Sequence, residues 1–222
     1  MYRTLELFDL EHTLARELLE SCEYPWLALS KIGETILTLG ASLGEAYEEL
    51  SPQVWVHKSA AVAPTASITG PCIIGPGTQV RHCAFIRGNA MVGANCVVGN
   101  SVELKNVIIF DGVEVPHFNY VGDSILGYKS HLGAGSVTSN IKSDRTNVIV
   151  KDGLEHIPTG MRKIGAMLGD FVEVGCNSVL NPGTIVGRHT NIYPLSCVRG
   201  TVPANSILKT GGVIVTKEVH HG

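Results

Sequence analysis

Aliphatic residues recur at every sixth position along the middle of the chain. The run begins at Val56 and continues through Val62, Ile68, Ile74, Val80, Ile86, Val92, Val98 and Leu104. A small residue usually stands two positions before the aliphatic one, and glycine often follows it. Neither the helical nor the strand period produces this pattern. It predicts short strands joined by tight corners, three of which complete one coil of a solenoid.

Two one-residue shifts interrupt the period without ending it. The aliphatic positions continue through Ile109, Val115, Val121, Leu126 and Leu132, and after a gap through Leu168, Val174, Leu180, Val186, Ile192 and Val198. We therefore expect one solenoid over residues 53–205 that ejects a long loop at 139–167. Loops longer than about 12 to 15 residues in a compact domain are usually functional, disordered or wrongly assigned. Because the repeat resumes cleanly after this loop, we expect it to be functional.

Residues 1–52 predict a helical appendage, and residues 206–222 predict a tail. Asp9 can cap a helix whose apolar face carries Leu10, Leu14, Leu18 and Cys22. Pro25 suits the first turn of a second helix, from Trp26 to about Leu39. Because open coil ends carry unpaired backbone groups, we expect these helices to cover the open end of the first coil.

Composition narrows the classes of function. The formal net charge of -3 gives no basic footprint for nucleic acid, and no apolar run approaches the ~18 residues of a membrane span. The first ten residues lack the basic and apolar pattern of a signal peptide, which predicts a cytoplasmic protein with reduced cysteines. Cys72 and Cys96 occupy small-residue positions of the repeat, where they are expected as buried hydrophobes.

Stacked positions carry the candidate chemistry. Arg87 and Lys105 stand eighteen residues apart, one coil, and both follow the aliphatic position, so they form a column of two cations. Like charges stacked in this way repel one another. The two side chains either splay apart in solvent or hold an anion between them, most simply a phosphate.

A second column contains His82, Asn100 and His117. A single histidine usually has no special task, but stacked histidines in a trimer could bind zinc, as in the gamma-type carbonic anhydrases. That family places a second histidine five residues after the first, where this chain has Gly122. Zinc binding is therefore the weaker alternative.

Several motifs together resemble one family. They are Arg87, Val-Gly-Asn at 98–100, Glu-Leu-Lys at 103–105, Pro-His-Phe-Asn-Tyr-Val-Gly-Asp at 116–123, Leu-Gly-Ala-Gly-Ser at 132–136 and Asn140. With this spacing, residues 56–205 resemble the C-terminal acetyltransferase domain of bifunctional N-acetylglucosamine-1-phosphate uridyltransferases. The segments 159–166 and 192–194 are more similar to sugar-1-phosphate nucleotidylyltransferases that carry such a half. The resemblance implies a left-handed parallel β-helix.

The resemblance also implies roles for individual residues. His117 matches the general base, which takes a proton from the substrate amine as its nitrogen attacks the thioester of acetyl-CoA. Glu103 matches a carboxylate near that histidine. The residues that match substrate contacts are Arg87, Lys105, Tyr120 and Asn140, with His131 where the family has asparagine.

In this superfamily the coenzyme A groove lies between subunits of a homotrimer. Ala134, Gly175, Cys176 and Pro194 occupy the matching positions, and Arg199 and Lys209 are candidates for the coenzyme phosphates. The resemblance implies acetyl-CoA as co-substrate and no metal in the chemistry.

The chain departs from the family at three positions. His131 replaces asparagine, Ile141 replaces a common tyrosine, and Thr146 replaces a phosphate-binding lysine. Lys142, Arg145 and Lys151 on the predicted loop are candidates to replace that lysine. The first fifty residues also lack the glycine-rich loop of the nucleotidyl-transfer half, so a separate nucleotidyltransferase is a candidate partner.

Three functions remain open. The first is an acetyl-CoA-dependent N-acetyltransferase acting on an amino-sugar 1-phosphate such as glucosamine 1-phosphate. The second is a non-catalytic homologue that binds a sugar phosphate or scaffolds a nucleotidyltransferase. The third is a zinc-dependent hydratase. His117 and its surroundings favour the first over the second, and Gly122 disfavours the third.

Overall fold

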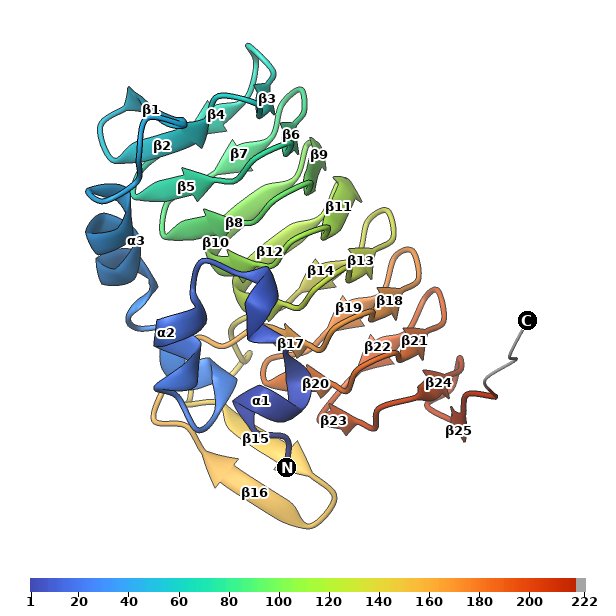
Figure 1. The fold of residues 1–222 in the computed structure, drawn as a ribbon. Coiled ribbons are helices and arrows are strands. Elements are labelled where there is room, and N and C mark those ends of the chain that lie inside the picture. Colours follow the sequence, from blue (N-terminus) through green and yellow to red (C-terminus); the bar gives the residue numbers. More distant parts are fainter. Residues whose placement is uncertain (219–222) are drawn as a thin grey trace.

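The computed structural model describes residues 1–218, which form a parallel β-solenoid with three faces (Figure 1). The first face comprises β2 (Val54–His57), β5 (Cys72–Ile74), β8 (Ala90–Val92), the ends of β10 (Glu103–Ile109) and β12 (Tyr120–Leu126), β17 (Ala166–Leu168), β20 (Thr184–Val186) and β23 (Thr201–Val202). The second comprises β3 (Ala61–Val62), β6 (Gln79–Val80), β9 (Val97–Asn100), β11 (Glu114–His117), β13 (His131–Leu132), β18 (Glu173–Val174), β21 (Asn191–Ile192) and β24 (Ser206–Leu208). The third comprises β4 (Ser67–Ile68), β7 (Phe85–Ile86), the starts of β10 and β12, β14 (Val137–Thr138), β19 (Val179–Leu180) and β22 (Cys197–Val198).

The six-residue period fills the solenoid interior. Ile74, Ile86, Val98 and Leu104 have no exposed surface, and each pairs in register with an aliphatic residue one coil away. Cys72 and Cys96 are buried beside them, and burial raises the pKa of the Cys72 thiol to about 12. The predicted left-handed parallel β-helix of hexapeptide repeats is confirmed.

The two shifts in the period lie where the third face meets the first. Earlier coils turn this corner through three residues, as at 87–89, with Gly88 and Asn89 at positive φ. β10 and β12 pass through it as continuous strands with a single positive-φ residue each, Asn106 and Asp123. Each of these coils is one residue shorter as a result, which accounts for the shift in the sequence pattern.

A second aliphatic column points outward from the first face. Its members are Ile73, Met91, Ile108, Ile125, Met167 and Ile185, each one residue before an inward-facing position, and all are at most 1% exposed. Strand alternation directs these side chains away from the interior. They therefore need a covering layer.

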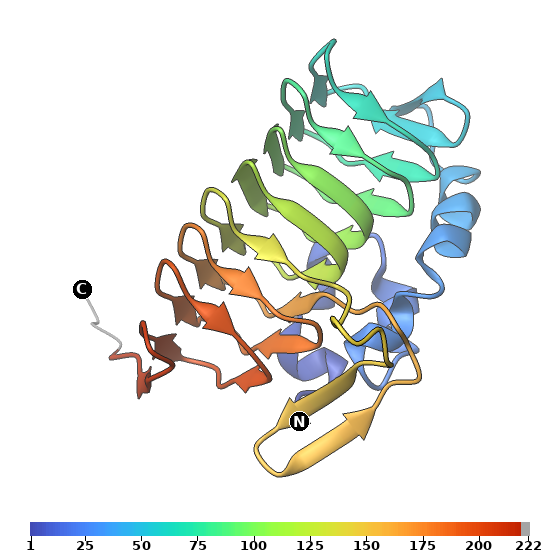
Figure 2. The same cartoon turned by 180° about the vertical axis from the view of Figure 1, so that it is seen from behind.

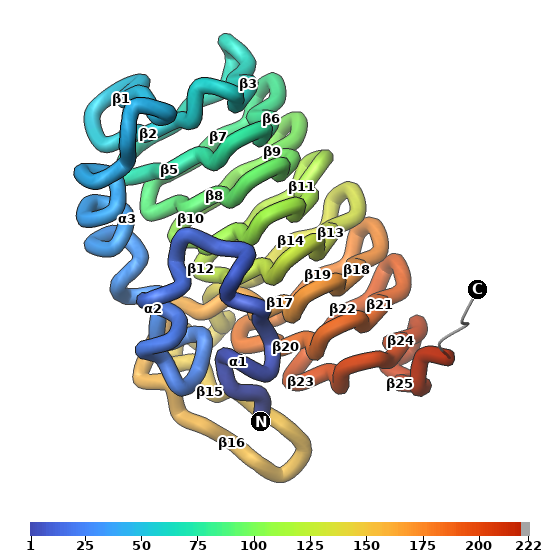
Figure 3. Tube along the Cα trace, viewed as in Figure 1, coloured from blue at the N-terminus to red at the C-terminus, as the bar shows by residue number. Residues whose placement is uncertain are grey.

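The N-terminal segment supplies that layer. It contains α1 (Thr4–Leu7), η1 (Leu10–His12), α2 (Arg16–Glu20), η2 (Pro25–Ala28) and α3 (Ile32–Gly40). These short helices run along the side of the solenoid (Figures 1 and 3), where α3 contacts β5, β8 and β10. Each of the two predicted helices is broken into two shorter ones. At the first break, Thr13 Oγ1 accepts a hydrogen bond from the backbone N–H of Ala15.

The expectation that the helices cover the open end of the first coil is wrong. The outward aliphatic column of the first face requires them along the side instead. The strand β1 (Tyr47–Ser51) pairs antiparallel with β2 and covers the free edge of the first face. The beginning of the N-terminal segment is anchored to the solenoid by Asp170. This residue is buried and accepts a hydrogen bond from the backbone N–H of Asp9.

Two hairpins complete the structure. The chain leaves the solenoid after β14 and returns at β17, and between them β15 (Ile149–Asp152) and β16 (Glu155–Pro158) form an antiparallel hairpin that projects from the side (Figure 2). β24 and β25 (Ile214–Thr216) form a second hairpin within the predicted tail, of which residues 219–222 lie outside the described residues. Among residues 1–218, no helix has the length and apolar character that crossing a membrane requires.

The outward column allows a test of the covering layer. Replacing Ile108 with valine removes one buried methylene under α3 and should lower the free energy of unfolding by about 1 kcal/mol. Urea denaturation measures this change. Ile149→Val, at a position that is 41% exposed, is the matched control and should leave the free energy of unfolding unchanged. Equal effects of the two substitutions would contradict the placement of the N-terminal segment.

Candidate functional site

The predicted site residues gather along two corners and the face between them. The first, the His117 corner, joins the second face to the third through residues 116–119, 133–136, 175–178 and 193–196. The second, the Asp123 corner, joins the third face to the first through residues 87–89, 105–106, 122–123 and 139–140. The outward side chains of the third face lie between them and include Glu103 and Tyr120, which pair in register.

His117 stands at the end of β11 with an exposed side chain. Its backbone N–H donates to Asn119 Oδ1 at 3.1 Å, and its carbonyl accepts from the N–H of Gly135 at 3.0 Å. Asn119 is buried and donates to the carbonyls of Gly133 and Ser136, which fixes the turn. The backbone of His117 is thus held on both sides while its imidazole remains open to solvent.

In this structure the Glu103 side chain forms an ion pair with Arg87. Its Oε1 accepts a hydrogen bond from Arg87 Nη1 at 2.7 Å, and these side chains are 32% and 47% exposed. Within residues 1–218, Glu103 makes no hydrogen bond to His117, so the contact that the resemblance implies is not formed here. Support of the histidine by Glu103 stays a prediction that requires the glutamate to leave Arg87.

The column of two cations is present, and each cation has its own carboxylate. The N–H of Arg87 donates to the carbonyl of Leu104, which brings Arg87 beside Lys105. Lys105 Nζ lies 3.0 Å from Asp123 Oδ1. The like-charge repulsion expected from the sequence is therefore offset by Glu103 and Asp123.

Asp123 is the residue that the sequence analysis missed. Its side chain is only 5% exposed, and it accepts hydrogen bonds from Lys105, Asn106 and Asn140. It stands seventeen residues after Asn106 and seventeen before Asn140, the spacing of the shortened coils, so the sequence also contained this signal.

Tyr120 and Asn140 are brought together at the same corner. Asn140 Nδ2 donates to the hydroxyl of Tyr120 at 3.1 Å. Burial, together with the carboxylates of Asp123 and Glu103, raises the pKa of Tyr120. The hydroxyl therefore keeps its proton at neutral pH and can act as a donor.

His131 lies apart from this group. It belongs to β13 on the second face, between Glu114 and Glu173 in register, and its Nδ1 is 3.0 Å from Glu173 Oε2. Within one protomer it does not join Tyr120 and Asn140. Its predicted contact with substrate stays a prediction.

Three of the residues predicted to contact coenzyme A occupy the His117 corner in the coils that follow His117. Ala134, Cys176 and Pro194 follow it in successive coils, linked by hydrogen bonds from Asn177 N to Ala134 O at 2.8 Å and from Leu195 N to Cys176 O at 2.9 Å. Gly175 precedes this column, and a Cβ there would lie 2.4 Å from the backbone nitrogen of Pro194. The close approach of coils therefore explains that glycine.

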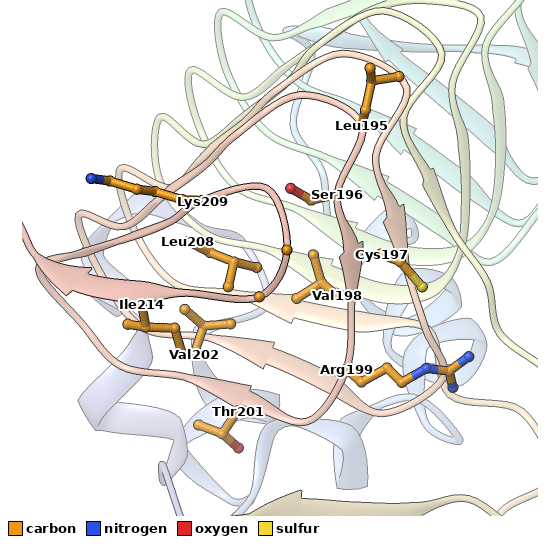
Figure 4. A pocket seen from close by; sticks show the side chains of 12 residues that line it. Leu195, Ser196, Cys197, Val198, Arg199, Thr201, Val202, Leu208, Lys209 and Ile214 are labelled. Atoms are coloured by element: carbon orange, nitrogen blue, oxygen red, sulfur yellow. The ribbon is translucent and has the colours of Figure 1, made fainter.

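Arg199 lies on the opposite side of the third face. It borders a cavity of about 440 Å³ at the end of the solenoid, where Arg199 and Lys209 extend in different directions (Figure 4). It also borders a cavity of about 200 Å³ together with Lys142 and Lys151. The structure thus groups Arg199 with the ejected loop rather than with the Ala134 column.

Lys142, one of the three candidates to replace the missing lysine, contacts Thr146. Its Nζ donates to Thr146 Oγ1 and lies 3.2 Å from Asp144 Oδ2. The ammonium group of Lys142, four residues before Thr146 in the sequence, therefore lies next to residue 146. Within residues 1–218 of one protomer, no three side chains of histidine, cysteine, aspartate or glutamate converge as metal ligands.

The model of the GMPPB C-terminal domain matches residues 68–190, which include the Asp123 corner and the His117 corner except for its last segment at 193–196. This chain belongs to that family. The GMPPB C-terminal domain model ends within the last coils, before β22.

Curated relatives agree with the family resemblance found in the motifs. A bifunctional protein GlmU from Methanococcus maripaludis is 34% identical over 136 residues, 61% of this chain and 33% of the relative. A bifunctional sugar-1-phosphate nucleotidylyltransferase/acetyltransferase from Sulfurisphaera tokodaii is 33% identical over 135 residues, 61% of this chain and 32% of the relative. This chain spans about a third of the length of these relatives. A solved structure of a hexapeptide transferase family protein from Anaplasma phagocytophilum covers 75% of this chain and 81% of its own, with 13% identity and a TM-score of 0.41.

Proposed function

We propose that the protein is an N-acetyltransferase that uses acetyl-CoA to acetylate an amino-sugar 1-phosphate such as glucosamine 1-phosphate. The observation that carries the proposal is the continuity of the His117 corner. An exposed histidine heads a column of small residues at Ala134, Cys176 and Pro194, and paired cations lie across the adjoining face. This arrangement can align an extended coenzyme with a base at its reactive end.

The chemistry requires one acyl transfer and the movement of one proton from the amine through His117 to the departing thiolate. His117 in its neutral form accepts a proton from the substrate amine while the nitrogen attacks the carbonyl carbon of the thioester. The carbon–sulfur bond then breaks, and the departing thiolate takes the proton from His117, giving free coenzyme A, the N-acetylated sugar phosphate and the neutral histidine. Arg87 and Lys105 bind the phosphate, with Glu103 displaced from Arg87. No metal ion takes part in these steps.

The site is shared between subunits of a homotrimer in this proposal. Phe118 and Leu195 extend from the His117 corner with 63% and 73% of their surface exposed. Apolar side chains at this exposure on the edge of a groove favour burial against a second copy. A neighbouring subunit would then close the coenzyme groove. A separate nucleotidyltransferase is the proposed user of the product.

Thiol release from acetyl-CoA tests the function directly. Purified protein is assayed with glucosamine 1-phosphate and with galactosamine 1-phosphate, before and after treatment with a chelator. Turnover that survives chelation supports the acetyltransferase and rules against the zinc hydratase. A folded trimer that releases no thiol with either sugar would overturn the proposal in favour of a sugar-phosphate-binding or scaffold protein.

Arg87 provides a more specific test. Replacing Arg87 with glutamine should raise KM for the sugar phosphate about tenfold, the change that about 1.4 kcal/mol produces, because a charged phosphate contact is lost. KM for acetyl-CoA should not change. Arg3→Gln, at a side chain that is 64% exposed on the N-terminal segment, removes the same charge and should alter neither constant. A larger change in KM for acetyl-CoA than for the sugar would contradict the assignment.

A further inference from the structure

Asp123 connects three successive coils at its corner. Its carboxylate is almost fully buried and receives Lys105 Nζ at 3.0 and 3.3 Å and Asn106 Nδ2 at 2.9 Å, besides the amide of Asn140. Lys105 and Asn140 come from different coils, and both belong to the proposed substrate site. One buried carboxylate therefore fixes two groups that face the substrate.

The hydrogen bonds at this corner determine which atoms remain available. Asn140 Nδ2 has two N–H groups, and it donates to both Asp123 and the Tyr120 hydroxyl. Its Oδ1 has no partner among residues 1–218, and the Tyr120 hydroxyl, which accepts from Asn140, retains its own proton for donation. Asn140 and Tyr120 thus present one acceptor and one donor side by side. A sugar hydroxyl, which both donates and accepts, matches this pair.

Asp123 also changes the charge that a phosphate meets. The column contains two cations, Arg87 and Lys105, and two carboxylates, Glu103 and Asp123, so it has no net formal charge. Glu103 is 32% exposed and can move aside, whereas Asp123 is buried and held by three donors. The negative charge beside Lys105 therefore persists when a ligand binds, and a bare phosphate gains less from this column than two free cations would provide.

We propose that Asp123 is a positioning residue that determines specificity, because it orients Asn140 and moderates Lys105 so that the site selects a sugar phosphate over phosphate alone. The inference deepens the proposed function and rests on its substrate site. It assigns to Asp123 the discrimination between ligands and leaves the chemical step to His117.

Asp123→Asn tests the inference with little change in shape. Asparagine tolerates the positive φ of 47° at this position, so the corner should keep its backbone. Dissociation constants for glucosamine 1-phosphate and for inorganic phosphate are measured by calorimetry on the wild type and the variant. The preference for the sugar phosphate should fall about tenfold, because its binding weakens while phosphate binding is unchanged or tighter. If turnover is present, KM for the sugar phosphate should rise and kcat should stay within about threefold.

Asp111→Asn is the matched control. Asp111 is another carboxylate at a corner of the solenoid; it accepts a hydrogen bond from the backbone N–H of Ala94 and lies outside the His117 and Asp123 corners. It should leave the ligand preference unchanged, and thermal unfolding of both variants reports any general loss of stability. Equal weakening of both ligands in Asp123→Asn, or no change in either, would overturn the inference.

The binding measurement separates this inference from the proposed function. If the wild type prefers the sugar phosphate and loses that preference in Asp123→Asn but releases no thiol, the acetyltransferase proposal fails and the role of Asp123 stands. If thiol is released and the preference survives in Asp123→Asn, the role of Asp123 fails and the acetyltransferase proposal stands. A wild type with no preference for the sugar phosphate overturns the role of Asp123 outright.

Discussion

His117→Ala is expected to lower kcat for acetyl transfer by about 10²- to 10⁴-fold, the usual contribution of a general base. The imidazole is exposed and has no hydrogen-bond partner among the described residues, so its removal should not disturb the fold. The backbone bonds that hold the turn, from His117 to Asn119 and from Gly135 to His117, do not involve the ring. The measurement is the rate of thiol release at saturating acetyl-CoA and sugar phosphate.

His156→Ala controls for the loss of an exposed histidine. His156 lies on β16 of the ejected hairpin, opposite Lys151, and takes no part in the proposed chemistry. Its removal should leave kcat unchanged. A His117→Ala variant that keeps its fold and more than about a fifth of the wild-type rate would exclude this histidine as the base.

The fold could be predicted because the same inward-facing aliphatic position recurs throughout the repeat. Every inward aliphatic residue from Ile74 to Val98 contributes to a single periodic signal, and even a one-residue shift leaves the period visible. The outward aliphatic column from Ile73 to Ile185 does not stand out in the sequence. Each member is next to an inward-facing aliphatic residue, so the two together read as one apolar strand. The position of the covering helices therefore could not be predicted from the pattern.

The sequence predicted which residues of the candidate site stack in successive coils, but not which side chains form ion pairs. Coil spacing brought Arg87 next to Lys105, and it aligned Asn100 with His117. Which carboxylate each cation meets depends on the shortened corner, where Asn106 and Asp123 adopt positive φ, and no composition rule indicates that geometry. Glu103 shows the same limit, since the family resemblance places it near the histidine, whereas in the structure it pairs with Arg87.

Gly99→Ala is expected to have the largest effect on stability of any substitution considered. Gly99 is buried in β9, one coil from the strand that carries His117, and a Cβ there would lie 1.6 Å from the carbonyl oxygen of Pro116. The obstructing atom is backbone, and the ring of Pro116 restricts its own φ, so the clash cannot be relieved by a side-chain rotation. We expect a loss of about 3 kcal/mol or more in the free energy of unfolding, measured by urea denaturation.

Gly44→Ala separates this clash from the general effect of replacing glycine. A Cβ at Gly44 would meet no atom within 4 Å, so the free energy of unfolding should change by about 0.5 kcal/mol or less. Because Pro116 directly precedes His117, any Gly99→Ala protein that remains folded should also lose acetyl transfer out of proportion to its stability. A Gly99→Ala protein as stable as Gly44→Ala would mean that the coils carrying Asn100 and His117 are farther apart than the structure places them.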